Sequence, residues 1–597
     1  MALLGLLAFF TISLALSKDN VNKIWVPMDE RIKIWDSIAG KGNYKVSENG
    51  LEATFEKEGA KWTIMGANAS IVAPTIYPKA WPVKGDGCDV MVIPQPITDY
   101  KILPFTENIE NAVTSKFIEV TAARDSYEAA SFVIRTGDAD LEDINIEATN
   151  LIVETKDKDE NIREIILPRE NVDIRVVKCW YQAGFKHDDI KHKRLVPELL
   201  LHDDKVIKVD YSNQVNVVKD FEKFQDANIL KPFSIPKKQN KQIWLTVHIG
   251  KDINMGDYTG EIKIVAGARR LGTLKLVVKV LPFVLPAPML NYAVYYLGYL
   301  SEAMEPVISS TLKTQDQMYF ELVDMKEHGL TNATLYHESV KGEAIDRYKR
   351  WKKLEKTLAI KEKMGWGSKP LLYLDWTNAF SNDLDIYRKK VEHIVEIAKS
   401  LGINDVYIYG VDEKKGKELR ALRPMYQTVH SAGAKNFVAC MDDFFSSVPD
   451  LIDLPVLHGL ANRAFMSDYK RTGKELWVYA NIKGEVEMPE TYRYMYGGNL
   501  LKEGFTGTCI FAYQVFSWND FANSEYHAHT LAYPTINKPT PTIQWEGLRQ
   551  GINDIRYLTL LKQKGQLNKN WLQRHCFNDL NNCRSNAIKT INASFEQ

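Results

Sequence analysis

The stretch DVYIYGVDE, residues 405–413, combines the pattern of a buried strand with two adjacent carboxylates. Its short run of apolar and aromatic residues is typical of a β-strand inside a protein. The run ends at Asp412 and Glu413, and a basic, glycine-containing segment at 414–416 follows directly. Catalytic groups of a (β/α)8 barrel lie at the carboxyl ends of its strands, so this pair is the first candidate for a catalytic site.

Seven further strand-like runs accompany this stretch between residues 289 and 540. They alternate with helical patterns, as in parallel α/β domains. Eight strands over about 250 residues match the size of a (β/α)8 barrel, or TIM barrel. The other predicted strands are NYAVYYLGY (291–299), NATLYH (332–337), PLLYLDW (370–376), NFVACMD (436–442), LPVLHGL (454–460), LWVYANI (476–482) and TCIFAYQVF (508–516).

The residues on either side of the predicted barrel have other patterns. Residues 18–110 form an accessory β-rich region, and 111–285 contain short strands with Gly, Asn and Asp turns, which predict a β-sandwich. Within it, the charged and poorly periodic segment 185–235 is interpreted as a long excursion. The proline-rich run at 281–289 marks the boundary with the barrel. Residues 541–597 are predicted to be a C-terminal helical segment.

The first residues, MALLGLLAFFTISLALS (1–17), predict a signal peptide, because a short apolar stretch ends in the small residues Ala15 and Ser17. A secreted, periplasmic or lumenal protein is therefore expected; an apolar N-terminal strand is the alternative interpretation. Lys plus Arg and Asp plus Glu both number 76, which argues against nucleic acid or an anionic membrane as the main partner. No later segment has the length and hydropathy of a membrane span.

Six cysteines are few for a disulfide scaffold of this length. Cys440 and Cys509 fall in predicted buried strands and are interpreted as core thiols. Cys576 and Cys583 are close together in the helical segment and could form one disulfide in an oxidising compartment. No metal-binding motif occurs, so neither a metal nor another cofactor is expected.

Several segments occur in an order that resembles a known family. YGVDE (409–413) is followed by LWVYANI (476–482), YRYMYGG (492–498) and WEGLRQGINDIRYL (545–558), after a sandwich region ending in WLTVHIGKDINMGDYTGEIKI (244–264). Over roughly residues 110–565 the chain resembles the family 123 glycoside hydrolases and their relatives. That resemblance implies an exo-acting β-N-acetylgalactosaminidase that works by substrate assistance. It also implies Glu413 as general acid/base and Asp412 as the residue that orients and stabilises the 2-acetamido group.

The chemistry of glycoside cleavage favours the same pair. One carboxyl group must be protonated to donate to the leaving oxygen, and a neighbouring carboxylate raises its pKa. Adjacent side chains on a strand point to opposite faces, so the strand must end or twist at Asp412 if both residues act on one sugar. Adjacent carboxylates do not easily span both faces of a sugar, which favours the acetamido oxygen as internal nucleophile and retention of configuration. Acidic residues in the first turn of a helix are the alternative interpretation of the pair.

Polar and aromatic residues end several other predicted strands and are candidates for substrate binding. Aromatic faces pack on sugar C–H surfaces, and Asn, Gln and Asp hydrogen-bond to hydroxyls. Each of them alone could equally be a structural residue. His337 and His458 also lie on or at the ends of strands and are interpreted as core histidines rather than catalytic ones. The candidates are Tyr373, Asp375, Trp376, Asp442, Asp443, Tyr479, Asn481, Tyr513, Gln514 and Trp518.

Two alternative functions remain open at this point. A glycosidase of the same architecture could act on a sugar without an acetamido group, with Asp375 or Asp442 as nucleophile about 5–5.5 Å from Glu413. The chain could also be a non-catalytic carbohydrate-binding protein on the same fold. In each case the expected partner is a carbohydrate, and the oligomeric state is left open.

Overall fold

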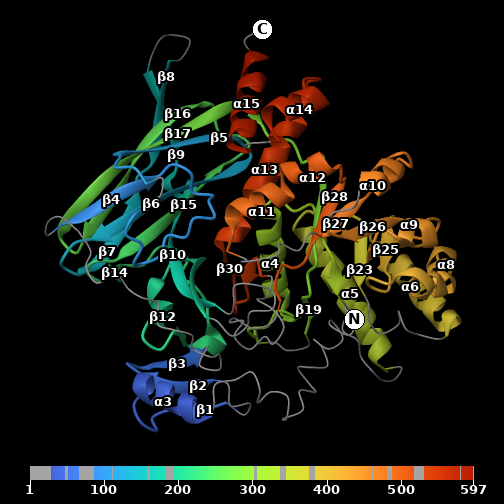
Figure 1. Cartoon of the computed structure of the whole chain (residues 1–597), viewed down its shortest axis with the longest axis horizontal. Helices are drawn as coiled ribbons and strands as arrows, with labels where there is room; N and C mark the ends of the chain where they lie inside the picture. The colour runs from blue at the N-terminus through green and yellow to red at the C-terminus, as the bar shows by residue number, and fades with distance from the viewer. Residues whose placement is uncertain are drawn as a thin grey trace.

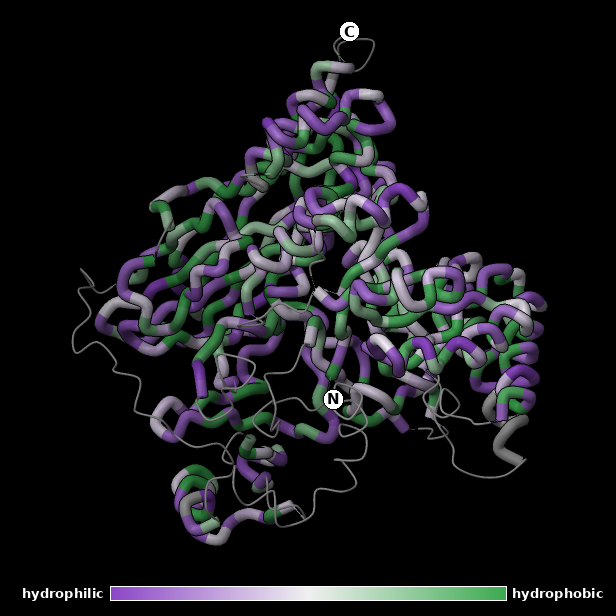
Figure 2. Tube along the Cα trace, turned by 45° about the vertical axis from the view of Figure 1, so that its right-hand side comes forward, coloured by the Kyte–Doolittle hydropathy of each residue, from purple (hydrophilic) through white to green (hydrophobic). Residues whose placement is uncertain are grey.

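The structure is a computed structural model of the whole chain, and its two halves have different architectures. In Figure 1 the strands of the first half lie on one side, the alternating strands and helices of the second half lie on the other, and the last helices stand between them. In Figure 2 hydrophobic and hydrophilic residues alternate along the outer helices, as expected for helices with one buried face. The structure describes residues 28–47, 52–65, 87–109, 112–156, 162–182, 193–301, 305–336, 345–374, 383–459, 463–479, 487–515, 530–577 and 580–595.

The second half is built on one parallel sheet in the order β21-β18-β28-β27-β26-β25-β24-β23-β22. Its two edge strands, β21 and β22, are separated in the sequence only by Thr334, whose amide donates to the carbonyl of Val294 at 3.0 Å. The sheet therefore curves into a nearly closed barrel, and all eight predicted strand segments take part in it. The strands are β18 (Asn291–Val294), β21 (Asn332–Ala333), β22 (Leu335–Tyr336), β23 (Leu371–Leu374), β24 (Val406–Tyr409), β25 (Lys435–Cys440), β26 (Leu454–His458), β27 (Trp477–Tyr479) and β28 (Gly507–Ile510).

Amphipathic helices cover the outside of the barrel. In α6 (Leu384–Ser400) the side chains of Val391, Ile394, Val395 and Ala398 are buried, at the spacing of one helix face. The side chain of Asp383 caps its first turn by accepting from two backbone amides. The other helices of this half are α4 (Gln315–Glu327), α5 (Ile345–Lys363), α7 (Gly416–Ala421), α8 (Arg423–Ser431), α9 (Phe444–Ser447), α10 (Arg463–Lys470), α11 (Pro489–Tyr496) and α12 (Gly498–Glu503).

The first half contains a five-stranded sheet, β11-β10-β15-β6-β4, and a seven-stranded sheet, β14-β7-β16-β17-β5. Apolar side chains from both, such as Trp180 and Leu245 of the former and Tyr258 and Leu276 of the latter, belong to one buried core. The strands are β4 (Cys88–Ile93), β5 (Phe117–Arg124), β6 (Ser126–Thr136), β7 (Leu141–Ala148), β10 (Val172–Gln182), β11 (Arg194–Leu201), β14 (Phe233–Ile235), β15 (Asn240–Ile249), β16 (Gly256–Ala266) and β17 (Arg269–Val284), with the hairpin β8 (Leu151–Lys156) and β9 (Ile162–Leu167) beside β16.

The N-terminal residues share their sheets with later parts of the chain. β4 precedes residue 110 but pairs with β6 of the five-stranded sheet. The predicted excursion 185–235 instead supplies strands to three sheets, because β11 and β14 join the two large ones and β12 and β13 extend a small one. That small sheet has the order β1-β2-β3-β13-β12, and the helix α3 packs against it. Its elements are α3 (Met28–Ala39), β1 (Lys45–Val46), β2 (Ala53–Lys57), β3 (Ala60–Met65), β12 (Ile207–Asp210) and β13 (Val215–Lys219).

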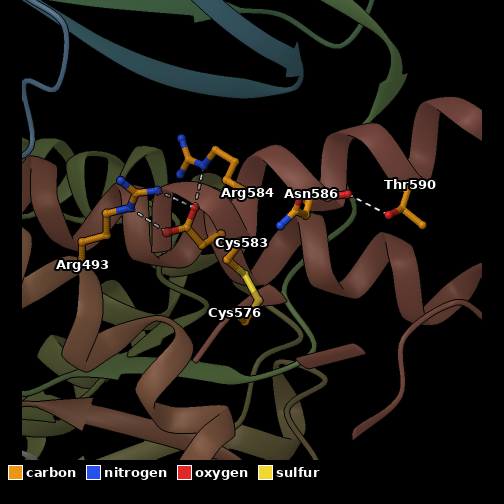
Figure 3. The surroundings of a disulfide bond; sticks show 7 residues. Arg493, Cys576, Cys583, Arg584, Asn586 and Thr590 are labelled. Carbon is orange, nitrogen blue, oxygen red and sulfur yellow. Dashed lines mark hydrogen bonds and ion pairs between the residues drawn. A yellow bond between two sulfur atoms is a disulfide. The ribbon is translucent and has the colours of Figure 1, made fainter. Parts of the chain in front are cut away.

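The C-terminal segment is helical, with α13 (Ile543–Gln563), α14 (Lys569–His575) and α15 (Leu580–Ala593). The carboxylate of Asp554 on α13 accepts from Arg493 of α11 at 2.7 Å and from Arg584 of α15 at 2.6 Å (Figure 3). Cys576 and Cys583 are joined by a disulfide next to this cluster (Figure 3). The cluster and the disulfide together fasten the last helices to the barrel. The core thiols predicted at 440 and 509 are buried in β25 and β28.

Candidate active site

Asp412 and Glu413 lie where the chain leaves β24 at the carboxyl end of the barrel. The strand ends at Tyr409, and Glu413 has a φ of 49°, in the left-handed region that non-glycine residues rarely adopt. The amide of Glu413 still donates to the carbonyl of Ala439 on the neighbouring strand at 2.9 Å. The chain therefore changes direction at this pair while remaining anchored to the barrel, so the two side chains are released from strict strand alternation.

The carboxylate of Asp412 is buried, with 6% of the residue exposed. The Tyr409 hydroxyl donates to its Oδ1 at 2.6 Å. Burial raises the pKa of Asp412 to about 7; the Tyr409 hydrogen bond opposes this rise, and the neighbouring charge of Glu413 adds to it. Asp412 thus changes its charge near neutral pH, which is unusual for an aspartate and is a common property of functional sites.

Aromatic side chains form the floor beneath Asp412. The ring of Tyr295, directly after β18, makes edge contacts with the rings of Tyr409, Tyr479 and Phe511 at centroid distances of 6.0, 6.3 and 5.9 Å. The Tyr295 hydroxyl also donates to the Tyr409 hydroxyl at 3.3 Å. This floor keeps the surroundings of Asp412 apolar, and it places Tyr479, a predicted substrate-binding residue, in the mouth of the barrel.

Glu413 faces the other side of the mouth, toward β26. Its Oε1 lies 3.6 Å from Nδ1 of His458, and the exposed fractions of the two side chains are 15% and 38%. The imidazole of His458 stacks on the ring of Tyr479 at 5.2 Å. The prediction of a core histidine at 458 is therefore wrong: the side chain is partly exposed beside the candidate acid. Its position near the carboxyl end of the predicted strand 454–460 was the signal that could have indicated this place.

A cavity of about 370 Å³ opens next to His458, over the carboxyl ends of β25 and β26. Asp442 and Asp443, both predicted from the end of their strand, are in its wall. Oδ2 of Asp443 accepts from the amide of Gly416 at 2.7 Å, which holds the turn that follows Glu413. The lining residues are Lys415, Met441, Asp442, Asp443, Leu457, His458 and Gly459.

Three other predicted residues lie away from this mouth. Tyr373 pairs with Ile408 in the register of β23 and β24, so its side chain is on the face of the sheet opposite to Tyr409. The Tyr513 hydroxyl donates to Oδ2 of Asp324 on α4 at 2.8 Å. Gln514 is part of a buried polar cluster in which its Nε2 donates to Glu321 at 2.9 Å. The predicted residues Asp375, Trp376, Asn481 and Trp518, and also His337, lie outside the described residues.

The chain combines a nearly closed parallel barrel with a preceding half built of two large sheets. The structure is similar to that of a family 123 glycoside hydrolase from Clostridium perfringens, studied for glycolipid glycan hydrolysis, with a TM-score of 0.60 and 11% identity over 85% of this chain and 98% of that chain. A family 39 glycoside hydrolase from Bacteroides cellulosilyticus WH2 has a TM-score of 0.31 and 13% identity over 55% of this chain and 76% of that one, too low to carry an argument. No protein-family model and no curated protein matches the sequence.

Among the described residues, no helix combines the length and the hydropathy needed to cross a membrane.

Proposed function

We propose that the protein is a retaining exo-glycosidase that releases terminal β-linked N-acetylgalactosamine, or another N-acetylhexosamine, from glycans by substrate-assisted catalysis. The observation that carries the proposal is the adjacent pair at the barrel mouth. Asp412 is buried and held by Tyr409, and Glu413 is more exposed and turned toward His458. Two carboxyl groups in such different surroundings suit two different tasks. The likeness to a family 123 enzyme supports a carbohydrate substrate.

In the proposed reaction Glu413 donates its proton to the leaving oxygen while the substrate's acetamido oxygen attacks the anomeric carbon. The bond to the leaving group breaks, and the sugar becomes a bicyclic oxazolinium ion. Asp412, as a carboxylate, accepts from the acetamido N–H and stabilises the developing positive charge. Because the Tyr409 hydroxyl occupies Oδ1, we assign this contact to Oδ2. Water then opens the ring, giving its proton to Glu413, and the original configuration is retained.

We also propose that the two large sheets form a β-sandwich that supports the barrel, and that the protein acts outside the cytoplasm. The shared core of the sheets supports the former. The Cys576–Cys583 disulfide supports the latter, because disulfides persist in oxidising compartments. The signal peptide predicted for residues 1–17 falls outside the described residues and stays a prediction.

The test compares aryl β-glycosides with and without a 2-acetamido group. We expect hydrolysis of the N-acetylgalactosaminide, inhibition by a thiazoline analogue, and loss of activity in Glu413→Gln that is greatest for poor leaving groups. Asp405→Asn is a matched control, because it removes a carboxylate at the opposite end of the same strand. Full turnover of acetamido sugars by Asp412→Ala would reject substrate assistance. Cleavage of the plain galactoside alone would favour a separate nucleophile, and glycan binding without turnover would favour a non-catalytic protein.

A further inference from the structure

The five-stranded sheet of the first half packs one of its faces against helices of the second half. Asp173, Arg175 and Val177 alternate along β10, so they share a face of the sheet, while the residues between them enter the core of the first half. The side chain of Val177 belongs to the same buried cluster as Ile543 of α13. The face that carries Asp173 and Arg175 is therefore turned toward α13, a helix that also packs on the barrel.

His202, directly after β11, is buried beside these two residues, with 4% of the residue exposed. Its Nε2 lies 2.6 Å from Oδ1 of Asp173, and its Nδ1 lies 2.7 Å from the carbonyl oxygen of Ala227. Both partners are acceptors, whereas a neutral imidazole has only one N–H to donate. Asp173 is itself held as a carboxylate, because Arg175 donates to its other oxygen at 2.6 Å. The contacts of His202 therefore require a doubly protonated, positively charged ring.

His328, at the end of α4, has a similar arrangement on the barrel side of the contact. It is 4% exposed, and its ring stacks on that of Trp545 of α13 at 4.3 Å. Nδ1 lies 2.8 Å from the carbonyl oxygen of Asp324, so this nitrogen carries a proton. Nε2 lies 3.4 Å from Oε1 of Glu546 and is buried, without a hydrogen-bond partner among the described residues. A bare lone pair would face the carboxylate there, whereas an N–H is attracted to it, so the geometry favours a charged ring here too.

The charged groups around the two rings balance when both histidines are protonated. With neutral histidines, four buried carboxylates would face only two arginines, and uncompensated buried charge is costly. Burial opposes the charged form of Arg175, but the surrounding carboxylates raise its pKa overall, and Glu546 of α13 is one of them. The network therefore crosses from β10 to α13 and on to α4. Its carboxylates are Asp173, Asp226, Asp324 and Glu546, its arginines are Arg175 and Arg549, Glu327 and Lys538 lie at its edge, and Tyr127 and Tyr513 are the phenols beside it.

We propose that this contact is a pH-sensitive latch, in which His202 and His328 are cations while the five-stranded sheet is docked on α4 and α13, and which loosens when they lose their protons. The inference does not depend on the proposed function. Burial lowers the pKa of each histidine, but the facing carboxylates outweigh it and raise both pKa values above the ordinary one. The stabilisation is then fully present below the pKa of the unfolded chain, about 6.5, and is lost as the pH rises through the folded value.

Loss of the proton has a defined structural consequence at His202. A neutral ring can donate to either Asp173 or Ala227 but not to both, so one of these contacts breaks. Ala227 lies in the segment 224–232, whose first carbonyl, that of Phe224, accepts from the amide of Ile536 at 3.1 Å. Ile536 belongs to the chain that leads into α13. Loosening is therefore expected in 224–232 and in the first turns of α13.

Hydrogen exchange of the full chain, read by mass spectrometry and corrected for the intrinsic effect of pH, tests the latch. Protection of residues 224–232 and 543–549 should fall by about tenfold or more between about pH 5.5 and about pH 8.5, as for a pKa difference of about one unit. Residues 580–593 of α15 provide an internal control. They are held through Arg584 to Asp554 and Glu128, a cluster without a histidine, so their protection should change less than about twofold.

Two variants identify the groups responsible, because glutamine is neutral at both pH values. His202→Gln should lower the protection of 224–232 at the acidic pH and remove its pH dependence, and His328→Gln should do the same for 543–549. His393→Gln is the matched control, since it removes an exposed histidine paired with Glu396 on α6 and should behave as the wild type.

Three results would overturn the latch. One is equal protection of both segments at the two pH values in the wild type, a comparison that decides the matter even if a variant fails to fold. Another is an unchanged pH dependence in both variants. The third is an equal loss of protection in α15, which would indicate general destabilisation instead of a local contact.

Discussion

Asp412→Asn removes a buried charge and keeps the shape of the side chain. The amide oxygen of asparagine can still accept from Tyr409, as Oδ1 does at 2.6 Å in the native residue. Folding raises the pKa of Asp412 from 3.8 to about 7, chiefly because the carboxylate is buried. The folded protein therefore holds this proton more tightly than the unfolded chain does. The stability from this group is fully present below about pH 4 and is lost as the pH rises through about 7.

The size of the stability change follows from the difference between the folded and unfolded pKa values of Asp412. About three pH units, each worth about 1.4 kcal/mol, correspond to about 4 kcal/mol of unfolding free energy. Asparagine does not titrate, so the stability of Asp412→Asn relative to the wild type should increase by up to about 4 kcal/mol between pH 4 and pH 8. Denaturant unfolding at several pH values measures this difference directly.

A second variant provides the control. Asp442 is exposed at the same mouth, so Asp442→Asn should change the unfolding free energy by less than about 0.5 kcal/mol at either pH. If the difference between Asp412→Asn and the wild type were the same at pH 4 and pH 8, the assignment of a buried, destabilised carboxylate at position 412 would be refuted.

Three further predictions concern the site and the C-terminal helices. Tyr409→Phe removes a hydrogen bond that favours the charged form of Asp412, so the acidic limb of the kcat/KM profile should move to higher pH by about one unit; an unmoved limb would contradict the role of this hydroxyl. Asp554→Asn removes the carboxylate that the buried Arg493 and Arg584 share, while Arg584 keeps its ion pair with Glu128, and should lower the unfolding free energy by about 3 kcal/mol in denaturant titrations. Replacing Cys576 and Cys583 together by Ser opens a short loop and should cost about 2–3 kcal/mol, measured against the oxidised wild type; equal stability of the two would show that the disulfide contributes nothing.

The barrel could be predicted from the sequence because its strands are short, apolar and separated by amphipathic helices. That pattern depends on local alternation of elements, and all eight strand segments were found near their expected positions. The first half was harder to predict. β13 pairs with β3, more than a hundred residues away in the sequence, and such long-range pairing leaves no local pattern.

Part of the barrel mouth could also be predicted, because its acidic residues follow local strand patterns. Asp412 and Glu413 stand out because a strand pattern stops at two acids, and Asp442 and Asp443 follow the same rule. Tyr373 also lies near a strand end, yet its register turns the side chain to the outer face. His458 looked like a core residue, yet it lies beside Glu413. A shift of one residue along a strand moves a side chain from one face of the sheet to the other. The sequence pattern of a single strand does not indicate which face a given residue occupies.

The amino-acid sequence alone indicates a parallel α/β unit in which one strand ends in an acidic pair, because both are local patterns of residue type. Three features came only from the folded structure: which strand ends share the mouth, how deeply Asp412 is buried beside Tyr409, and where Glu413 points. These depend on barrel closure, on the register between strands, and on the left-handed backbone at Glu413. They arise from contacts between residues far apart in the chain, and those contacts set the burial and charge that give each carboxylate its own chemistry.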